Sequence, residues 1–537
     1  GRMPRLRCSR PHTPLRTMLR ATTFQHRPLR GNTDTPQNTR ASGAFLTQAK
    51  LLYRPKGRLR MSQAVSATAT KARRPLPHWL APAVIWVVGS LWILTILQWM
   101  RIFRRDQLEQ GVILRLGDSA DSAWQTIRLW EMWTLGPQVL WQMHIYPPLY
   151  DGIRFLLMLP DTLSGAPPTA LAVDKRLYWL SAVLFGLVAM VIYLWIRDLT
   201  DNGWWALSGS LLWMLLPSSI SFMTILNQTG LAIASMAVAF YFLYRFLRTR
   251  RNIYAAVFLG SLLIASLTRN VVQVHVFLIL CVAVVAFYWI GRPRSWRYLV
   301  VYGLLLAAIA FWPIRALALY STFDVSTHTG YNRAGALWIH PRAVPEPAWP
   351  ENIEQNATLL SSGWNTQETL RDNYRLGSAA NEFMVTQPLE AAQRMFDSAQ
   401  ITWPVMFRSV FIQWENQFLM EYPLARSLDS LFSGASFQLL IATTVLILLA
   451  RVVSQGNYRI FIRYGWFAVF WTLTAIPVLL SNRHWPVEEM VPIHSEADRL
   501  RALIDIPVFV LMFFAAFTAA QWIGASLRKY RSPEVKS

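Results

Sequence analysis

Ten long runs of apolar residues, separated by polar segments, dominate the chain. They cover 79–100, 177–196, 204–223, 229–247, 253–268, 271–290, 298–319, 435–451, 463–480 and 503–524. Each is close to the ~20 residues that an α-helix needs to cross the apolar core of a bilayer. The pattern predicts an all-α polytopic membrane protein with about ten transmembrane helices. The fifth and sixth runs meet at Arg269-Asn270, which indicates either a tight reversal or a kink.

The polar segments between these runs differ in length and charge. Two are long, 101–175 and 320–434, a third covers 481–502, and most of the others are short and rich in Arg. With ten crossings, all the short basic loops fall on one side, which the positive-inside rule assigns to the cytoplasm together with both termini. The long segments then lie on the outer side, where we expect them to form a small, mainly helical cap. Amphipathic periodicity predicts a helix over about 383–411 within the second of them.

Composition agrees with this class. Of the 537 residues, 53% are hydrophobic and 15% charged, which is unlike a soluble enzyme. The net charge of +23 is concentrated in residues 1–74, which hold about 17 Lys and Arg and one acid, so it gives no reason to expect a nucleic-acid partner. We expect this tail to be disordered. It is either an organelle transit peptide or sequence upstream of a protein that begins at Met61.

These boundaries divide the chain into four parts. We expect a basic tail over 1–74, an N-terminal transmembrane module over 75–319, an outer segment over 320–434 and a C-terminal transmembrane module over 435–537. The two cysteines, Cys8 and Cys281, lie in the tail and in an apolar run, so neither a disulfide nor a cysteine metal site is expected.

The first outer segment carries the clearest candidate chemistry. Asp118 and Asp121 open an aromatic stretch that is too polar to span a bilayer and closes with a Tyr-Pro-Pro-Leu-Tyr turn. A carboxylate held just outside the membrane by aromatic helices can act as a general base. The alternative is an interfacial loop whose aspartates cap helices, because Asp118 has the sequence context of an N-cap.

Several local motifs, in this order and topology, resemble one family. The acidic loop GDSADSAWQ follows the first span, HIYPPLYDG leads into a helix, and Thr268-Arg269 ends a span. Later come GYNRAGALWIHPRAVPEP, an amphipathic stretch around YRLGSAANEF, and SEADRLRALIDIPVFVLM before the last span. Over about 79–524 the chain resembles the C-type membrane glycosyltransferases, specifically bacterial relatives of dolichyl-phosphate-mannose protein mannosyltransferase and aminoarabinose transferase. No motif is specific alone.

The resemblance implies an inner (plasma) membrane enzyme. Such enzymes move a sugar from a polyprenyl-phosphate donor to a lipid, glycan or protein acceptor on the outer face. One carboxylate deprotonates the acceptor, which implies Asp118 as the first choice of base and Asp121 as the second. No organic cofactor is implied, and some relatives use a divalent ion whereas others do not.

Cations are required for the leaving phosphate. Arg499 and Arg501 precede the last span, and Arg269 ends another, so all three are candidates for binding the donor phosphate. The alternative for the first two is interfacial snorkelling with pairing to Glu496 or Asp498, and for Arg269 an interface anchor.

The remaining candidates are aromatic and histidine residues of the outer loops. Tyr146 and Tyr150 are expected to shape the sugar or lipid cleft or simply to pack the loop, and His494 is a further cleft candidate. His484 and His494, with nearby glutamates, match no standard metal-ligand spacing, so no metal site is assigned.

Two other functional classes stay open. A transporter or flippase of a lipid-linked substrate needs broken helices and polar residues in mid-membrane, whereas these spans are nearly free of ionisable residues apart from Arg315. A non-catalytic protein of envelope assembly needs neither the acidic outer loop nor the arginines beside it.

Overall fold

The structure is a computed structural model of the chain, which divides into the units Gly1–Arg74 and Pro75–Ser537. All the residues that it describes belong to the second unit. They are 79–103, 126–224, 226–269, 274–321, 326, 329–346, 350, 353, 365–402, 427, 430–431, 434–455, 459–479 and 494–531. The predicted tail, the acidic loop with Asp118 and Asp121, and the histidine loop around His484 therefore lie outside the described residues.

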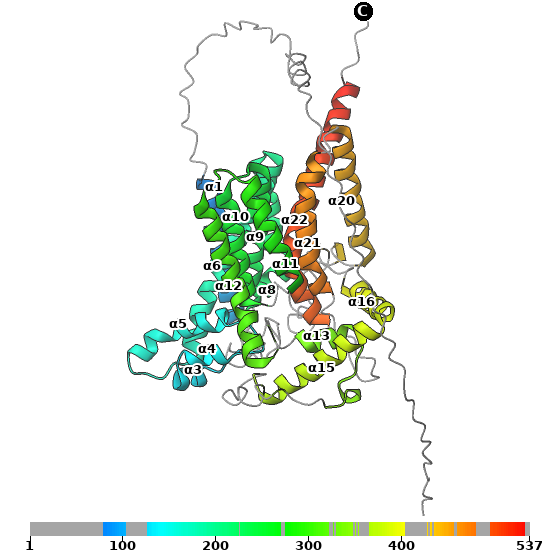
Figure 1. Cartoon of the computed structure of the whole chain (residues 1–537). Coiled ribbons are helices and arrows are strands. Elements are labelled where there is room, and N and C mark those ends of the chain that lie inside the picture. Colours follow the sequence, from blue (N-terminus) through cyan, green and yellow to red (C-terminus); the bar gives the residue numbers. More distant parts are fainter. Residues whose placement is uncertain are drawn as a thin grey trace, which may run out of the picture. The chain divides into compact units, whose positions relative to one another are not determined.

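All regular elements of the described residues are helical (Figure 1). The first half holds α1 (Leu80–Phe103), α3 (Leu129–Leu135), α4 (Gln138–Gln142), α5 (Leu149–Leu163), α6 (Ala170–Thr200), α7 (Gly203–Leu215), α8 (Pro217–Thr224), α9 (Thr229–Thr249) and α10 (Asn252–Thr268). The second half holds α11 (Val274–Ile290), α12 (Trp296–Tyr320), α13 (Thr329–Ala336), the 3-10 turn η1 (Pro341–Ala343), α15 (Gln367–Thr386), α16 (Pro388–Thr402), α20 (Gly434–Gln455), α21 (Arg459–Leu479) and α22 (His494–Arg531). The predicted all-α class is thus confirmed for the described residues.

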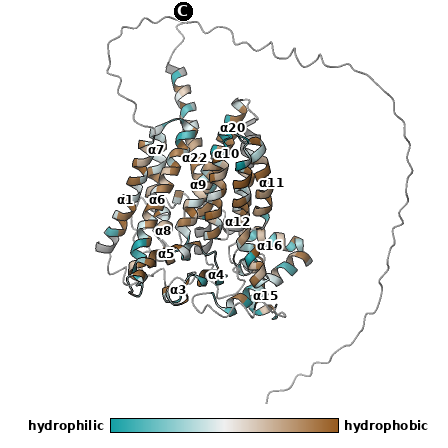
Figure 2. Ribbon diagram, turned by 60° about the vertical axis from the view of Figure 1, so that its left-hand side comes forward, coloured by the Kyte–Doolittle hydropathy of each residue, from teal (hydrophilic) through white to brown (hydrophobic). Residues whose placement is uncertain are grey.

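Six of these helices are long and apolar enough to cross a membrane: α1, α6, α9, α12, α20 and α22. The segments α10 and α11, together with the stretch Phe467–Ile476 of α21, are shorter apolar helices. Figure 2 shows hydrophobic residues along the bundle helices and many hydrophilic residues along α15 and α16. The prediction of a helical membrane protein is therefore supported.

One predicted span differs from the sequence expectation. The run 204–223 is not one straight helix, because α7 and α8 are bent by 64° at their junction. Leu216 leaves the helical region with a ψ of 126°, and Pro217 follows it. A proline disfavours a helical conformation in the residue before it and cannot donate a backbone hydrogen bond, which explains the break inside an apolar run.

The interior of the bundle is built around α9. In its membrane-length window 78% of the residues are buried, against 22% in α1 and 11% in α20, so α9 is central and the other two are peripheral. The helices α1 and α6 approach closely where Gly89 and Gly186 cross, and Trp86 Nε1 donates a hydrogen bond to the Val183 carbonyl at 3.0 Å. Only small residues permit such close approach of two helix backbones.

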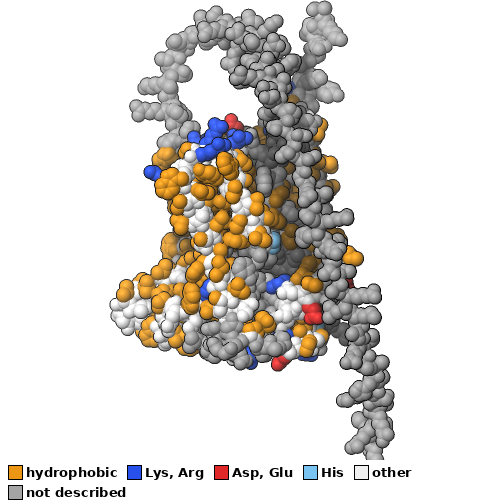
Figure 3. All heavy atoms as spheres, viewed as in Figure 1, with side chains coloured by type: hydrophobic (Ala, Val, Ile, Leu, Met, Phe, Trp, Pro, Cys, Tyr) orange, Lys and Arg blue, Asp and Glu red, His pale blue; other side chains and the backbone are white. Residues whose placement is uncertain are grey.

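One end of the bundle, which we call the basic face, collects the short arginine-rich loops (Figure 3). There Arg245 forms an ion pair with Asp198 at the end of α6, with an N–O distance of 2.7 Å. The Arg292 amide donates to the Arg250 carbonyl at 2.6 Å, and the Asn252 amide donates to the Arg292 carbonyl at 3.1 Å. The end of α11 therefore returns to the start of α10, so the chain reverses its direction between these two helices rather than forming one kinked helix.

The opposite end, which we call the loop face, carries α3, α4 and α5 together with α13, α15 and α16 (Figure 1). Asp161 accepts two hydrogen bonds of 2.8 Å from Arg176, which ties the end of α5 to the start of α6. The predicted helix over 383–411 is wrong in its bounds, because α15 ends at Thr386 and Pro388 begins α16. Residues 403–411 lie outside the described part.

Candidate functional site

A buried ion pair fixes the chain that follows the acidic loop. Arg154 Nη1 lies 2.6 Å from Asp151 Oδ1 and donates a second hydrogen bond of 2.6 Å to the Ile127 carbonyl. Asp151 Oδ1 also accepts from the Ile127 amide at 3.4 Å. The side chains of Arg154 and Asp151 are 0% and 3% exposed, so water does not weaken the pair. Ile127 is therefore held against α5 through both of its backbone polar groups.

The turn 143–148 joins the two long polar segments that follow α1 and α12. Asn365, which stands just before α15, accepts hydrogen bonds of 3.2 Å from the amides of His144 and Ile145 through one side-chain oxygen. Ser326, which lies between α12 and α13, donates its hydroxyl to the Ile145 carbonyl. These contacts bridge about 180 to 220 positions of sequence. The second segment thereby supplies backbone hydrogen-bond partners that the turn cannot make by itself.

The end of α12 at the loop face holds the same turn from the other side. Arg315 Nη1 donates to the Met143 carbonyl at 2.8 Å, and Tyr320 donates its hydroxyl to the Gln142 carbonyl at 2.8 Å. Arg315 also lies over the Trp312 ring, 4.4 Å from its centroid, and 5.3 Å from that of Trp141. Arg315, the ionisable residue that the sequence places inside an apolar run, is only 4% exposed. It therefore holds the loop through a buried hydrogen bond rather than facing lipid.

His144 is buried between the same residues, beside Arg315 and Tyr320. Its ring packs edge-on against Tyr320 with centroids 5.6 Å apart, and 4% of the residue is exposed. Burial, and secondarily the positive charge of Arg315, lower the pKa of His144 from 6.5 to about 3. The imidazole is therefore neutral at physiological pH, and protonating it would place a second positive charge beside the buried Arg315.

The two predicted catalytic aspartates, Asp118 and Asp121, lie outside the described residues, so their geometry stays a prediction. Arg499 and His494 belong to the first turns of α22, and their side chains are not described either. Arg499 and Arg501 were expected just before the last span. Instead the helix already includes both of them, and its apolar span starts at Arg501.

Arg501 is buried and paired. Its Nε donates to Asp505 Oδ1 at 3.0 Å, one helical turn later, and its guanidinium lies 5.1 Å from the Phe437 centroid. The side chains of Arg501 and Asp505 are 4% and 2% exposed. The snorkelling interpretation predicted that Arg501 would pair with Glu496 or Asp498. It also predicted that the guanidinium group would reach solvent. The observed burial disfavours that interpretation.

Arg269 follows the last residue of α10 at the loop face, and its side chain points into the helix bundle. Its backbone is extended, with a φ of −144° and a ψ of 156°, and its amide still donates to the Ala265 carbonyl. Its Nη1 lies 3.4 Å from Thr229 Oγ1 at the start of α9, and the residue is 2% exposed. An arginine that anchors a helix at the membrane interface keeps its guanidinium in solvent. Arg269 is instead buried within the helix bundle, at the end that carries the loop face.

The two tyrosines are buried, at 7% for Tyr146 and 6% for Tyr150. Tyr150 packs in a small core under α3, α4 and α5, and burial raises the pKa of its hydroxyl. A neutral, buried ring favours the packing interpretation for Tyr150 over a direct role in proton transfer. Among the described residues no group of three or more His, Cys, Asp and Glu is arranged to hold a metal ion.

Sequence reasoning did not find several of the groups that organise this region. Asp151 and Arg154 carry a detectable signal, because opposite charges three apart fall on one face of an amphipathic helix. Asn365 and Ser326 carry none, since isolated polar residues in a polar segment do not reveal a partner some 200 positions away.

Comparisons of the chain with protein-family models, with curated proteins and with solved structures give no match.

Proposed function

We propose that this protein is a membrane glycosyltransferase of the C type, working at the loop face. In this proposal a polyprenyl-phosphate-linked sugar enters from the membrane, and an acceptor approaches from the outer side. Asp118, or alternatively Asp121, is the general base, while Arg269 and Arg501 stand near the donor phosphate. The observation that carries the proposal is the burial of both arginines where membrane helices reach the loop face, at 2% and 3% exposure.

The burial of Arg269 and Arg501 at the end of the membrane helices requires an energetic explanation. A guanidinium placed only to mark the interface gains most by keeping its head in water. Arg269 and Arg501 instead lose their hydration, which is costly unless an anion or strong hydrogen bonds compensate. A lipid phosphate lies at the same depth as these helix ends and accepts bidentate hydrogen bonds from arginine. Arg501 is already paired with Asp505, and Arg269 Nη1 donates to Thr229 Oγ1, so a donor phosphate would add to these contacts.

Chain length keeps the two carboxylates near this face. Ile127 is fixed against α5, and six residues separate it from Asp121, so that carboxylate stays within about 20 Å of the anchor. The corresponding limit for Asp118, nine residues away, is about 30 Å. The limit for Asp121 is shorter than the ~30 Å apolar core, so Asp121 cannot reach the opposite end of the bundle, which supports assigning the base to the loop face.

The chemistry requires one base and one stabilised leaving group. The acceptor oxygen or nitrogen attacks the anomeric carbon as the bond from that carbon to the phosphate oxygen breaks, and the carboxylate takes the acceptor proton. The phosphate leaves as an anion, so it needs cations rather than the second carboxylate of a hydrolase.

The membrane arrangement that goes with this proposal has ten crossings. We count α7 with α8 as one broken span and add α10, α11 and α21 to the six long helices. The 17-residue helices α10 and α11 span about 25 Å, slightly less than the ~30 Å apolar core, which local thinning or flanking residues accommodate. The basic face is then cytoplasmic, as are both termini, and the membrane is the plasma or inner membrane.

The deciding experiment compares Asp118→Asn with Asp121→Asn in purified protein given a labelled polyprenyl-phosphate sugar. Asparagine keeps the size and still caps a helix, but it cannot take a proton. Loss of the base is expected to lower the rate by roughly 10²–10⁴ while donor binding and stability stay near wild type. A pure capping role predicts a stability loss of ~1 kcal/mol or less and little kinetic change. If both variants turn over normally, the proposed mechanism is wrong.

One observation favours transport or flipping of a lipid-linked substrate as the second candidate. The span α7–α8 is broken, and in the described chain the hydroxyls of Ser218, Ser219 and Ser221 and the amide of Gln228 are buried with no hydrogen-bond partner. Broken helices lined by polar groups are typical of transporter binding sites. Reconstituted vesicles distinguish the two functions, because a flippase moves a labelled lipid-linked substrate between leaflets without changing it chemically.

A further inference from the structure

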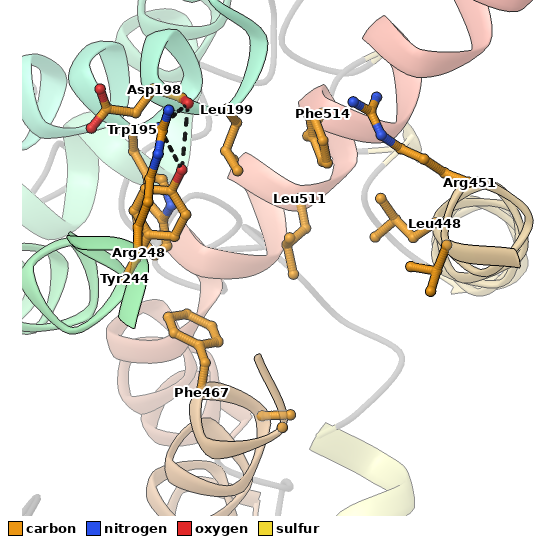
Figure 4. A pocket seen from close by; sticks show the side chains of 13 residues that line it. Trp195, Asp198, Leu199, Tyr244, Arg248, Leu448, Arg451, Phe467, Leu511 and Phe514 are labelled. Atoms are coloured by element: carbon orange, nitrogen blue, oxygen red, sulfur yellow. Dashed lines mark hydrogen bonds between the residues drawn. The ribbon is translucent and has the colours of Figure 1, made fainter. Parts of the chain in front are cut away.

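A cavity of about 500 Å³ opens between two parts of the bundle near the basic face (Figure 4). The helices α6 and α9 form one wall, and α20, α21 and α22 form the others. The lining is mainly apolar, with Trp195, Leu448, Phe467, Leu511 and Phe514 prominent. Its size lies within the 300–1,000 Å³ range of small-molecule sites, although no step of the proposed sugar transfer takes place at this end of the bundle.

The charged groups of the cavity are few and mostly positive. Asp198, Arg248 and Arg451 are the ionisable side chains of its lining. The Asp198 carboxylate forms an ion pair with Arg245 and accepts a hydrogen bond from Tyr241. Arg245 therefore neutralises its negative charge, and the positive charges of Arg248 and Arg451 dominate the electrostatic potential in the cavity.

Arg451 stands on the peripheral helix α20 and is half-buried, whereas Arg248, at the end of α9, is exposed. Arg451 Nη1 donates to Thr518 Oγ1 at 2.6 Å, and its guanidinium lies 4.6 Å from the Phe514 centroid. Among the described residues it forms no ion pair. A guanidinium carries five N–H donors, so most of its hydrogen-bonding capacity remains for a ligand. Figure 4 shows Arg451 and Arg248 on opposite sides of the cavity.

We infer that this cavity binds an anionic phospholipid of the leaflet at the basic face. One acyl chain lies among the apolar side chains, and the phosphate is held by Arg451, with Arg248 contributing charge. Basic sites between membrane helices on the cytoplasmic side suit anionic head groups, and each arginine near the surface contributes to that attraction. A free phosphate would gain nothing from the aromatic and aliphatic walls. The inference is independent of the proposed sugar transfer.

The test uses the full protein in nanodiscs containing an anionic phosphatidylglycerol with a photoreactive group in its acyl chain. Crosslinks are expected on α20, α21 and α22, and a phosphatidylcholine probe with the same chain is expected to label them far less. Arg451→Gln, which keeps size and removes charge, is expected to weaken labelling about fivefold. Arg297→Gln removes an exposed arginine of the same face outside the cavity and is expected to leave labelling unchanged.

A second pair of variants tests the acyl chain separately from the charge. Gly465 lines the cavity and has nothing within 4 Å of an added Cβ, so the side chain of Gly465→Leu begins in open space and occupies part of the cavity. It is expected to reduce labelling, whereas Gly303→Leu at an equally open position elsewhere is not. Equal labelling by both lipids, or unchanged labelling in Arg451→Gln and Gly465→Leu, would overturn the inference. Competition by inorganic phosphate alone would indicate an anion site without a lipid.

Discussion

Protonation of His144 is expected to weaken the contact between the two long polar segments at the loop face. The pKa of His144 is about 3 in the folded protein and 6.5 as an unperturbed imidazole. At pH 5 the unfolded chain has bound this proton and the folded protein has not, so the unfolded state binds more protons and stability falls as pH falls. The His144 contribution is complete above about pH 7 and decreases through the window from 6.5 down toward 3.

The magnitude follows from those two values. Between pH 8 and pH 5 the free energy of unfolding is expected to decrease by about 2 kcal/mol through this residue, with a slope that approaches ~1.4 kcal/mol per pH unit. That is a substantial part of the 5–15 kcal/mol that typically holds a domain together. The loss has a structural cause, because a charged His144 would lie beside the buried Arg315.

The assay is chemical unfolding in mixed micelles at pH 5, 6, 7 and 8, for wild type and for His144→Phe. Phenylalanine keeps a ring against Tyr320 but cannot be protonated. Titration of all other groups cancels in the difference between the two proteins, so that difference should change by about 2 kcal/mol across the range. His340→Phe, at a partly exposed histidine, is the matched control. A difference that stays constant with pH would refute the reasoning.

Two further substitutions probe other contacts. Asp151→Asn is expected to destabilise the protein by about 3 kcal/mol or more in the same assay, because it leaves the Arg154 guanidinium buried without its carboxylate. The double variant Asp151→Leu with Arg154→Met should cost clearly less than the sum of its two single variants, because each single leaves one charge buried without its partner; a double that costs that sum would contradict this. Gly186→Ala places a methyl group against the Trp86 backbone and is expected to cost about 1–3 kcal/mol. Gly303→Ala, where no atom lies near, is its control and should shift the unfolding midpoint little.

The helical content of the bundle was predictable because burial in lipid requires long apolar runs, and length alone reveals them. The side on which the basic loops gather followed from charge, as Asp198–Arg245 and the Arg250–Arg292 contact show for the described loops. The break before Pro217 was missed because hydropathy does not change there. The break at Pro388 was missed for a related reason, since amphipathic periodicity continues across the proline.

The candidate site was less predictable than the helices. Arg269 and Arg501 were identified from their positions beside apolar runs, but their burial depends on neighbours such as Thr229 and Phe437 that come from distant helices. The role of Arg315 depends on a carbonyl at Met143, and a backbone atom leaves no trace in the residue types of a sequence. Local pattern therefore reveals which side chains are unusual, while long-range hydrogen bonds decide what they hold.

The hydrogen bonds of Asn365 also set an order of events during synthesis. His144 and Asn365 are 221 positions apart, so at about 5–20 residues per second the turn is complete roughly 10 to 40 s after His144 is made. During that interval α6, α9 and α12 are translated, while the amides of His144 and Ile145 still lack their final acceptor. The turn after α4 is thus made early, yet its hydrogen bonds are completed only after α12 and α13 have been synthesised.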